Sequence, residues 1–217
     1  MSEITFWSEF YSKNAAQVPA DHSSFAAFVI EWMKENDHFP VSNKTLIDLG
    51  CGTARDSRFF ANQGMKVMGV DQAPNTIQMN NERKGPNETY WVDDFSHITD
   101  ERCTELDFIY SRFSIHSISK KNASDLYQWT AKSLKQGGLF LIEARSINDP
   151  LFKLGTPDPA GDPDASISGH YRRFIRLPEL IKELSSHGLT IVYQHEGENL
   201  SVCGDDNPVL LRVICQK

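Results

Sequence analysis

The segment LIDLGCGTARD, residues 46–56, joins an apolar run to a glycine-rich turn. Runs as short and as apolar as residues 45–49 are typical of strands buried in a parallel sheet. Gly50 and Gly52 allow a tight turn and a close approach of the backbone to a ligand. The following residues favour a helix, whose free N–H groups and positive dipole end attract polar or anionic groups. The segment therefore predicts a strand–turn–helix unit that binds a ligand at its turn.

An acidic residue follows the next apolar run at the spacing of an adenosine site. Asp71 ends the run 66–71 and lies 21 residues after Gly50. An acid about 20 residues past a glycine loop can accept hydrogen bonds from both ribose hydroxyls. A dinucleotide fingerprint would have a third glycine at position 55, where this chain has Arg55, which does not allow the same close helix–strand packing. The pattern predicts an adenosine cofactor and disfavours a dinucleotide.

Strand and helix patterns alternate along the chain, which predicts crossover connections and a mostly parallel sheet. Helical patterns cover residues 22–36 and 53–63, a stretch through Leu126, Trp129 and Leu134 that stops at the glycines 137–138, and residues 178–188. The connection 197–208 is polar and shows no helical period, so the last two strands are expected to be antiparallel neighbours. The seven expected strands are 45–49, 66–70, 88–92, 106–110, 138–144, 190–196 and 209–216.

The composition is that of a globular protein. Hydrophobic residues make up 40% and charged residues 24% of the 217, and the formal net charge is −7. An acidic surface repels phosphate backbones, so no nucleic-acid partner is expected. The chain shows neither a signal peptide nor an apolar stretch of membrane-spanning length, which predicts a cytoplasmic protein. Its cysteines, which lack metal or redox spacing, are Cys51, Cys103, Cys203 and Cys215.

Five segments, in this order, resemble the class I S-adenosylmethionine-dependent methyltransferases, and the resemblance extends over nearly the whole chain. They are IDLGCGTARD (47–56), VDQAP (70–74), VDDF (92–95), DFIYSRFSIHSI (107–118) and LKQGGLFLIEA (134–144). The resemblance implies an α/β fold, a Rossmann-like three-layer sandwich with a seven-stranded, mostly parallel sheet and an antiparallel last strand. We expect one domain over residues 1–217, with a helical cap at 1–40 and S-adenosyl-L-methionine as cofactor.

The resemblance also implies roles for the residues that match the motifs. Asp48 would orient the glycine loop and the cofactor's amino group, Asp71 would bind the ribose, and Asp94 would accept from the adenine amine. Tyr11 would close over the cofactor, as N-terminal helices do in many relatives. The residues expected to bind the cofactor are Tyr11, Asp48, Gly50, Cys51, Gly52, Arg55, Asp71, Gln72, Asp94, Phe95, Ser111 and Arg112.

The segment 145–174 is long and rich in Pro, Gly and Asp, and we expect it to form a lid over the methyl acceptor. Arg145, Tyr171, Arg172 and Arg173 are the expected acceptor-binding residues. Arginine pairs with carboxylate or phosphate in a bidentate manner, so an anionic acceptor is one interpretation. The other is that Arg145 and Arg172 pair with the aspartates of the same segment.

A hydroxyl acceptor must lose its proton during transfer, and histidine accepts protons near neutral pH. His116 is the preferred candidate base and His170 is the rival. No metal-ligand cluster is visible, so a metal site is not expected.

The function expected from the sequence is methyl transfer from S-adenosyl-L-methionine to a hydroxyl of a small molecule or sugar. In the first of the two interpretations above, this acceptor also carries an anionic group. A thiol- or tellurite-methylating enzyme is the alternative within the class. A nicotinamide-dependent oxidoreductase and a non-catalytic cofactor-binding protein are alternatives from other classes. Either a monomer or a homodimer is compatible with the sequence.

Overall fold

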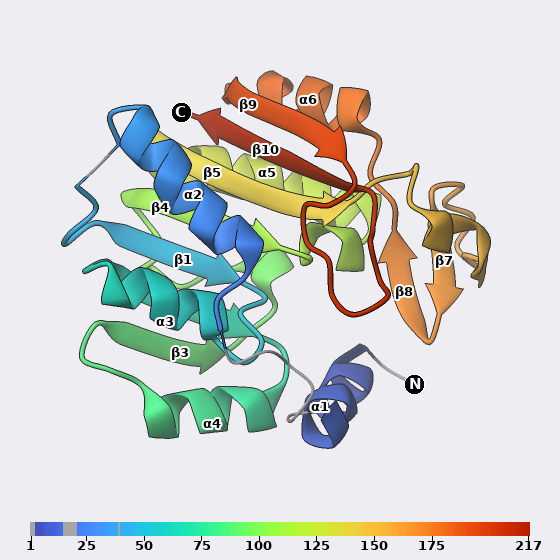
Figure 1. Ribbon diagram of the computed structural model, residues 1–217, viewed down its shortest axis with the longest axis horizontal. Helices are drawn as coiled ribbons and strands as arrows, with labels where there is room; N and C mark the ends of the chain where they lie inside the picture. The colour runs from blue at the N-terminus through green and yellow to red at the C-terminus, as the bar shows by residue number, and fades with distance from the viewer. Residues whose placement is uncertain (1–2, 15–20, 39) are drawn as a thin grey trace.

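The computed structural model describes residues 3–14, 21–38 and 40–217, and its main sheet has seven strands. The strands are β1 Thr45–Leu49, β2 Lys66–Asp71, β3 Glu88–Val92, β4 Leu106–Arg112, β5 Leu134–Arg145, β9 Thr190–Gly197 and β10 Leu210–Gln216. Their spatial order is β3-β2-β1-β4-β5-β10-β9 (Figure 1). β10 is antiparallel to β5 and β9, and the other neighbouring pairs are parallel. The predicted fold and its antiparallel last strand are confirmed.

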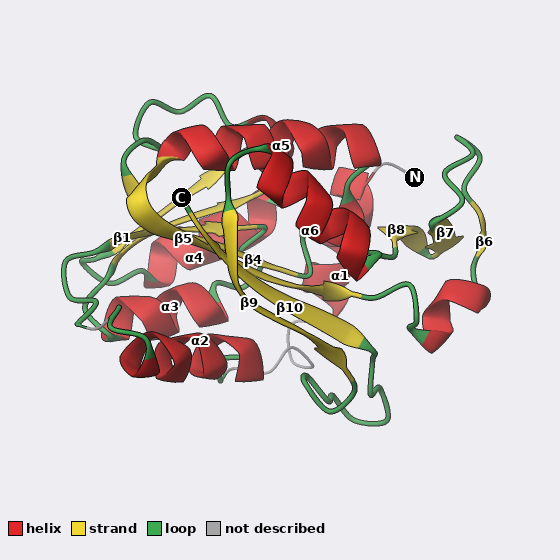
Figure 2. Cartoon of the chain, turned by 90° about the horizontal axis from the view of Figure 1, so that it is seen from above, coloured by secondary structure: helices red, strands yellow, loops and turns green. Residues whose placement is uncertain are grey.

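Helices cover both faces of this sheet (Figure 2). On one face lie α2 Ser24–Glu35, α3 Arg55–Asn62 and α4 Pro74–Arg83, and on the other lie α5 Lys120–Ser133 and α6 Leu177–Ser186. The helix α1 Glu3–Asn14 lies beyond the carboxyl ends of the strands (Figure 1). Three short 3-10 helices, η1 Phe95–His97, η2 Ile115–Ser117 and η3 Pro150–Lys153, complete the helical elements of the described residues. Within these residues, no helix is long and apolar enough to cross a bilayer.

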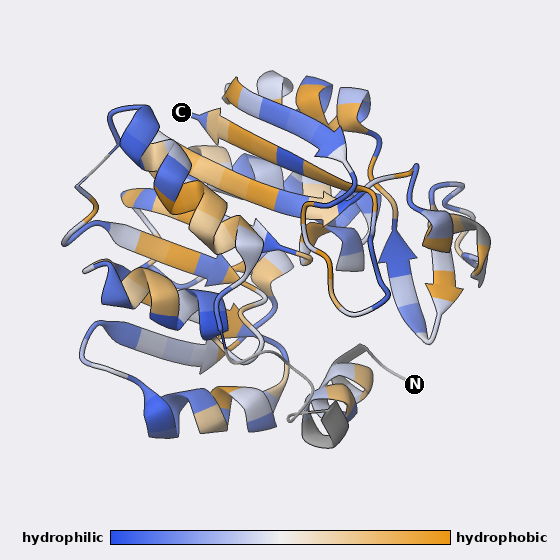
Figure 3. Cartoon of the chain, in the orientation of Figure 1, coloured by the Kyte–Doolittle hydropathy of each residue, from blue (hydrophilic) through white to orange (hydrophobic). Residues whose placement is uncertain are grey.

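Side chains alternate between the two faces of the sheet and are buried on both, and the central strands are coloured largely as hydrophobic in Figure 3. In β1, Leu46 packs with α2 and α3, whereas its neighbour Ile47 packs with α5 and α6. Both side chains are fully buried. Because both faces are covered, the central strands are apolar almost throughout, and polar side chains gather where the strands end.

The segment 145–174 contains structure that the sequence did not predict. β6 Thr156–Pro157, β7 Ala165–Ser168 and β8 His170–Arg173 form a small antiparallel sheet. Gly169 has a φ of +78°, which allows the tight turn between β7 and β8. No strand was predicted in this segment, and one glycine in the left-handed region converts this part of it into a hairpin.

The prediction for the residues before β5 was also wrong. The helix α5 ends at Ser133, and Leu134 is the first residue of β5, paired with Leu106 of β4. Leu134 stands eight residues after Leu126, a spacing that fits a helical face, but its backbone is extended. Its side chain is buried in the same core cluster as Leu126, so both conformations satisfy the apolar pattern.

Candidate functional site

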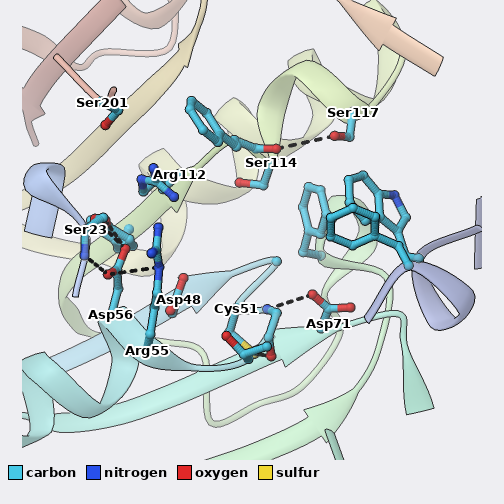
Figure 4. Close-up of a pocket in the computed structure, with 18 of the residues that line it drawn as sticks. Ser23, Asp48, Cys51, Arg55, Asp56, Asp71, Arg112, Ser114, Ser117 and Ser201 are labelled. Atoms are coloured by element: carbon cyan, nitrogen blue, oxygen red, sulfur yellow. Dashed lines mark hydrogen bonds and ion pairs between the residues drawn. The ribbon is translucent and has the colours of Figure 1, made fainter. Parts of the chain in front are cut away.

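A cavity of about 1010 Å³ lies beyond the carboxyl ends of β1, β2 and β4 (Figure 4). This is where ligands bind in open α/β sheets. Its wall includes the turn after β1, the ends of β2 and β4, α1, the residues before α2 and the connection between β9 and β10. Eleven of the residues expected to bind the cofactor line it, namely Tyr11, Asp48, Gly50, Cys51, Gly52, Arg55, Asp71, Gln72, Asp94, Phe95 and Arg112.

The glycine loop is held against β2 and covered by α1. Gly50 and Cys51 donate their N–H groups to the carbonyl of Val70, at 2.8 and 3.0 Å. Gly50 and Gly52 have φ values of +72° and +49°. A Cβ at Gly52 would lie 2.5 Å from the Tyr11 hydroxyl, so a glycine is required there for the tyrosine to cover the loop. Burial raises the pKa of Tyr11, which therefore stays a neutral phenol.

Asp71 links the glycine loop to the end of β2. Its Oδ2 accepts the N–H of Gly52 and its Oδ1 accepts the N–H of Ala73, both at 2.9 Å. Burial raises the pKa of the carboxyl, although these backbone donors act in the opposite direction. A carboxylate offers about four acceptor positions, so with backbone donors from Gly52, Ala73 and Gln72 at least one is left for a ligand hydroxyl.

Asp48 is a buried acid of the cavity wall. Burial raises its pKa to about 7, against the lowering effect of the Ser57 hydroxyl, which donates to Oδ2 at 2.6 Å. The charges of Asp56 and Asp71 raise it further. A cationic ligand group beside Asp48 would relieve this repulsion.

Asp94 and Phe95 form another part of the wall, at the start of η1. Burial acts to raise the pKa of Asp94, but hydrogen bonds from Ser96 and Gln72 outweigh it and keep the pKa low. Ser96 donates its N–H and its hydroxyl to Oδ1, at 2.9 and 2.7 Å. Asp94 is therefore an ionised acceptor near neutral pH, and the Phe95 ring borders Gly50.

Arg112 presents a positive charge to the same cavity (Figure 4). Its Nε donates at 3.0 Å to Glu143, a fully buried residue of β5. Glu143 also accepts from Arg212 at 2.7 Å and from Ser201 at 2.9 Å. One carboxylate between two guanidinium groups leaves positive charge in excess. Together with Asp48, Arg112 makes a wall that suits a group carrying an ammonium and a carboxylate.

The histidines expected as bases lie away from the cavity wall. His116 is buried, its Nδ1 accepts the N–H of Arg145 at 3.2 Å, and burial together with nearby arginines lowers its pKa. His170 packs against the rings of Phe6 and Trp7, with ring centroids 4.7 and 4.9 Å apart. Among the histidines of residues 21–38 and 40–217, His22 is the one that lines the cavity, stacked on Phe59.

Of the expected acceptor-binding residues, Tyr171 lines the cavity and the three arginines do not. Arg145 forms ion pairs with Asp149 and Asp206. Arg173 donates to the carbonyls of Ile115 and Ile118, both at 3.3 Å. Ser111 is also buried outside the wall, within 2.6 Å of the Ser114 hydroxyl. Arg145 is thus paired with aspartates in this structure, of which Asp149 belongs to the same segment 145–174.

The sequence reasoning missed one side of the site. Ser23 donates its N–H and hydroxyl to Asp56 at 2.6 and 2.7 Å, which fixes the residues before α2 at the cavity (Figure 4). The connection 198–209 supplies a further wall, and Ser24 hydrogen-bonds to it through the carbonyl of Leu200 at 2.6 Å. The N-cap position of Ser23 was a usable signal, whereas the contact with residues 198–209 depends on tertiary packing.

Comparison with known proteins agrees with this architecture. Residues 46–138 match the family described as a methyltransferase domain. No curated protein matches the sequence. A S-adenosylmethionine-dependent methyltransferase structure from Clostridium acetobutylicum is similar at 16% identity and a TM-score of 0.70, with 98% of each chain covered. One from Methanosarcina mazei has 17% identity and a TM-score of 0.67, covering 85% of this chain and 96% of that one.

A third similar structure is the 1,6-didemethyltoxoflavin-N1-methyltransferase of Burkholderia thailandensis, which contains 1,6-didemethyltoxoflavin and S-adenosylhomocysteine. It has 15% identity and a TM-score of 0.68, with 98% of this chain and 88% of that chain covered. These likenesses establish the fold, and the family match covers the glycine loop and the strands β1 to β4. Residues 46–138 thus match a methyltransferase domain, and the chain as a whole has the fold of S-adenosylmethionine-dependent methyltransferases.

Proposed function

We propose that this enzyme methylates a hydroxyl group of a small molecule such as a sugar. The observation that carries the proposal is the cavity of about 1010 Å³. Ligand pockets usually measure roughly 300–1,000 Å³ for one drug-sized ligand. A cavity at the upper limit has room for the cofactor and a small acceptor side by side. The bound small molecule in the Burkholderia thailandensis structure is consistent with an acceptor of this size.

The chemistry of the wall supports a neutral, hydroxylated part of the acceptor. Away from the glycine loop, the wall is made mainly of hydroxyl, amide and aromatic side chains. Hydroxyl and amide groups both donate and accept, which suits the hydroxyls of a sugar, and aromatic rings suit its apolar faces. These residues are Trp7, Phe10, Ser23, Ser24, Phe113, Ser117, Ser119, Asn122, Tyr171, Asn199 and Ser201.

The chain's own contribution to catalysis is then positioning, exclusion of water and acceptance of the hydroxyl proton, for which the wall offers the imidazole of His22. When bound, S-adenosylmethionine supplies a methyl group already activated on a sulfonium. Asp71 and Asp94 would fix the nucleoside, and Asp48 and Arg112 would fix the amino-acid end. The aromatic side chains of α1 would cover the reacting atoms. Holding two reactants in line lowers the barrier by removing translational and rotational freedom in advance.

Parallel calorimetric titrations with S-adenosylmethionine, S-adenosylhomocysteine and NAD test the cofactor part of the proposal. We expect binding of the first two and none of NAD, because Arg55 stands where a dinucleotide fold needs its third glycine. Sugars and other polyhydroxylated small molecules are then screened for methyl transfer. Transfer to thiols, with none to hydroxyl acceptors, would contradict the proposed acceptor class.

Arg112→Gln is expected to weaken S-adenosylhomocysteine binding by about tenfold or more, because a guanidinium–carboxylate hydrogen bond contributes about 1.5–3 kcal/mol. Binding of 5′-methylthioadenosine, which lacks the amino-acid group, should stay within about twofold of wild type. Glu143 keeps Arg212 as a partner in this variant, so no buried charge is left unpaired. Both affinities are measured by calorimetry.

Arg55→Gln is the matched comparison, because Arg55 is the second arginine of the wall and lies at the start of α3. If this variant loses S-adenosylhomocysteine affinity while Arg112→Gln does not, the carboxylate binds at the helix terminus and the role given to Arg112 is wrong. If Arg112→Gln weakened the binding of S-adenosylhomocysteine and 5′-methylthioadenosine equally, the cavity would be disturbed as a whole. That result would also contradict the role of Arg112 in binding the carboxylate.

A further inference from the structure

A second cluster of charged side chains lies directly behind the connection 198–209, outside the cavity wall. Arg145, at the end of β5, donates through Nη1 to Asp149 at 2.8 Å and through Nη2 to the carboxylate of Asp206. Arg172, on β8, hydrogen-bonds through Nη2 to the Nε2 of His170 at 2.9 Å. The cluster joins three elements that are distant in the sequence.

Arg172 is the unusual member of this cluster. Across the described residues, no carboxylate lies within ion-pair distance of its guanidinium, and its buried Nε has no hydrogen-bond partner. Burial and the neighbouring charge of Arg145 lower the pKa of Arg172. Burial and the same two arginines lower the pKa of His170 to about 4, so the imidazole is neutral near neutral pH. The cluster therefore contains two guanidinium groups, one of them only partly used, and displacement of the Asp206 carboxylate would leave one positive charge in excess.

Asp206 separates this cluster from the cavity. Its side chain is half exposed and lines the cavity while its carboxylate pairs with Arg145. Its backbone N–H and carbonyl are paired with those of Cys203, at 3.0 and 2.9 Å, in a tight turn. Tyr171, the neighbour of Arg172 on β8, lines the cavity as well. A ligand in the cavity that displaced the Asp206 carboxylate would thus meet Arg145 next.

We propose that Arg145 and Arg172 form an anion subsite for the acceptor, and that Asp206 occupies this subsite when no acceptor is bound. The ligand class is a phosphate monoester, such as a phosphorylated sugar. A phosphate carries up to two charges and three acceptor oxygens, and so it can engage both arginines where one carboxylate engages only Arg145. Asp149 remains on the other side of Arg145. The inference rests on the proposed function, since it specifies the acceptor of that cavity.

The subsite is tested on the full-length protein by calorimetric titration with inorganic phosphate, at constant ionic strength because surface charges are screened by salt. Asp206→Asn should bind phosphate about tenfold more tightly than wild type, because the competing carboxylate is gone. Arg172→Gln should bind about tenfold more weakly. Arg176→Gln is the control, since it removes the same charge from an exposed arginine paired with Asp164. This control should remain within about twofold of wild type.

Unchanged phosphate affinity in Asp206→Asn, or equal affinities in Arg172→Gln and Arg176→Gln, would overturn the subsite. If the affinity of Asp206→Asn for acetate rose as much as its affinity for phosphate, the subsite would be one for carboxylates. That result would contradict a phosphate monoester as the ligand. S-adenosylhomocysteine is titrated into the Arg176→Gln control, whose side chain lies outside the cavity, and its affinity should not change. If the wild-type protein did not bind S-adenosylhomocysteine, the proposed function would be overturned, whereas the phosphate results bear on the subsite alone.

Discussion

Asp71→Ala is expected to weaken S-adenosylhomocysteine binding by about 100-fold, the largest effect of any single substitution in the site. Hydrogen bonds to a charged group contribute about 1.5–3 kcal/mol each, and two ribose hydroxyls would lose their acceptor. The N–H of Gly52 would also lose its partner, so the glycine loop would no longer be held in register with β2. Calorimetry gives the affinity, and thermal unfolding shows whether the variant is folded.

A ligand that lacks one ribose hydroxyl distinguishes the two roles of Asp71, which are to bind the ribose and to hold the glycine loop. Wild-type protein should prefer S-adenosylhomocysteine to its 2′-deoxy analogue, and Asp71→Ala should bind both equally weakly. Asp100→Ala is the control, because Asp100 pairs with Arg102 outside the cavity. Full discrimination between the two ligands in Asp71→Ala would show that Asp71 supports the loop without binding the ribose.

Asp48→Asn should stabilise the protein without cofactor at pH values above about 7 by about 2 kcal/mol, or about 5 °C in Tm. In the folded state the pKa of Asp48 is about 7, well above its usual value of 3.8. The folded protein therefore binds a proton that the unfolded chain does not, and stability falls as pH rises between these two values. Asparagine removes that penalty and still accepts from Ser57. Thermal unfolding near pH 4 and near pH 8 measures the difference, which should nearly vanish at the lower pH.

The same variant should bind S-adenosylmethionine about tenfold more weakly, because the acid that faces the cationic end of the cofactor is lost. Asp107→Asn is a control for which the opposite effect on stability is expected. Hydrogen bonds from Thr45 and Lys135, among others, outweigh the effect of burial and hold the pKa of Asp107 at about 2, so its substitution should destabilise the protein at neutral pH. If Asp48→Asn left the pH dependence of Tm unchanged, the burial of Asp48 would not be the cause of that dependence.

Local sequence was sufficient wherever one segment builds a feature by itself. The segment 46–56 contains a strand, a turn and the start of a helix, and its two glycines adopt positive φ values as the turn requires. The spacing from Gly50 to Asp71 determined that the carboxylate would reach the loop, because adjacent parallel strands end at the same edge. The reversed last strand followed from a connection without helical period.

Tertiary structure decided which charged side chains reach the cavity. The sequence grouped four residues with the site because they follow strand ends or lie in the segment 145–174, but burial and pairing direct them behind the wall. They are His116, Arg145, Arg172 and Arg173. It gave no indication that residues 198–209 would meet Ser24, a contact between positions about 176 residues apart in the chain. Patterns in a sequence report the period of one element, whereas the direction of a long charged side chain depends on which partner another element offers it. The side of the cavity formed by the glycine loop was therefore predictable from local sequence, and the side formed by the residues before α2 and the connection 198–209 was determined by packing between distant segments.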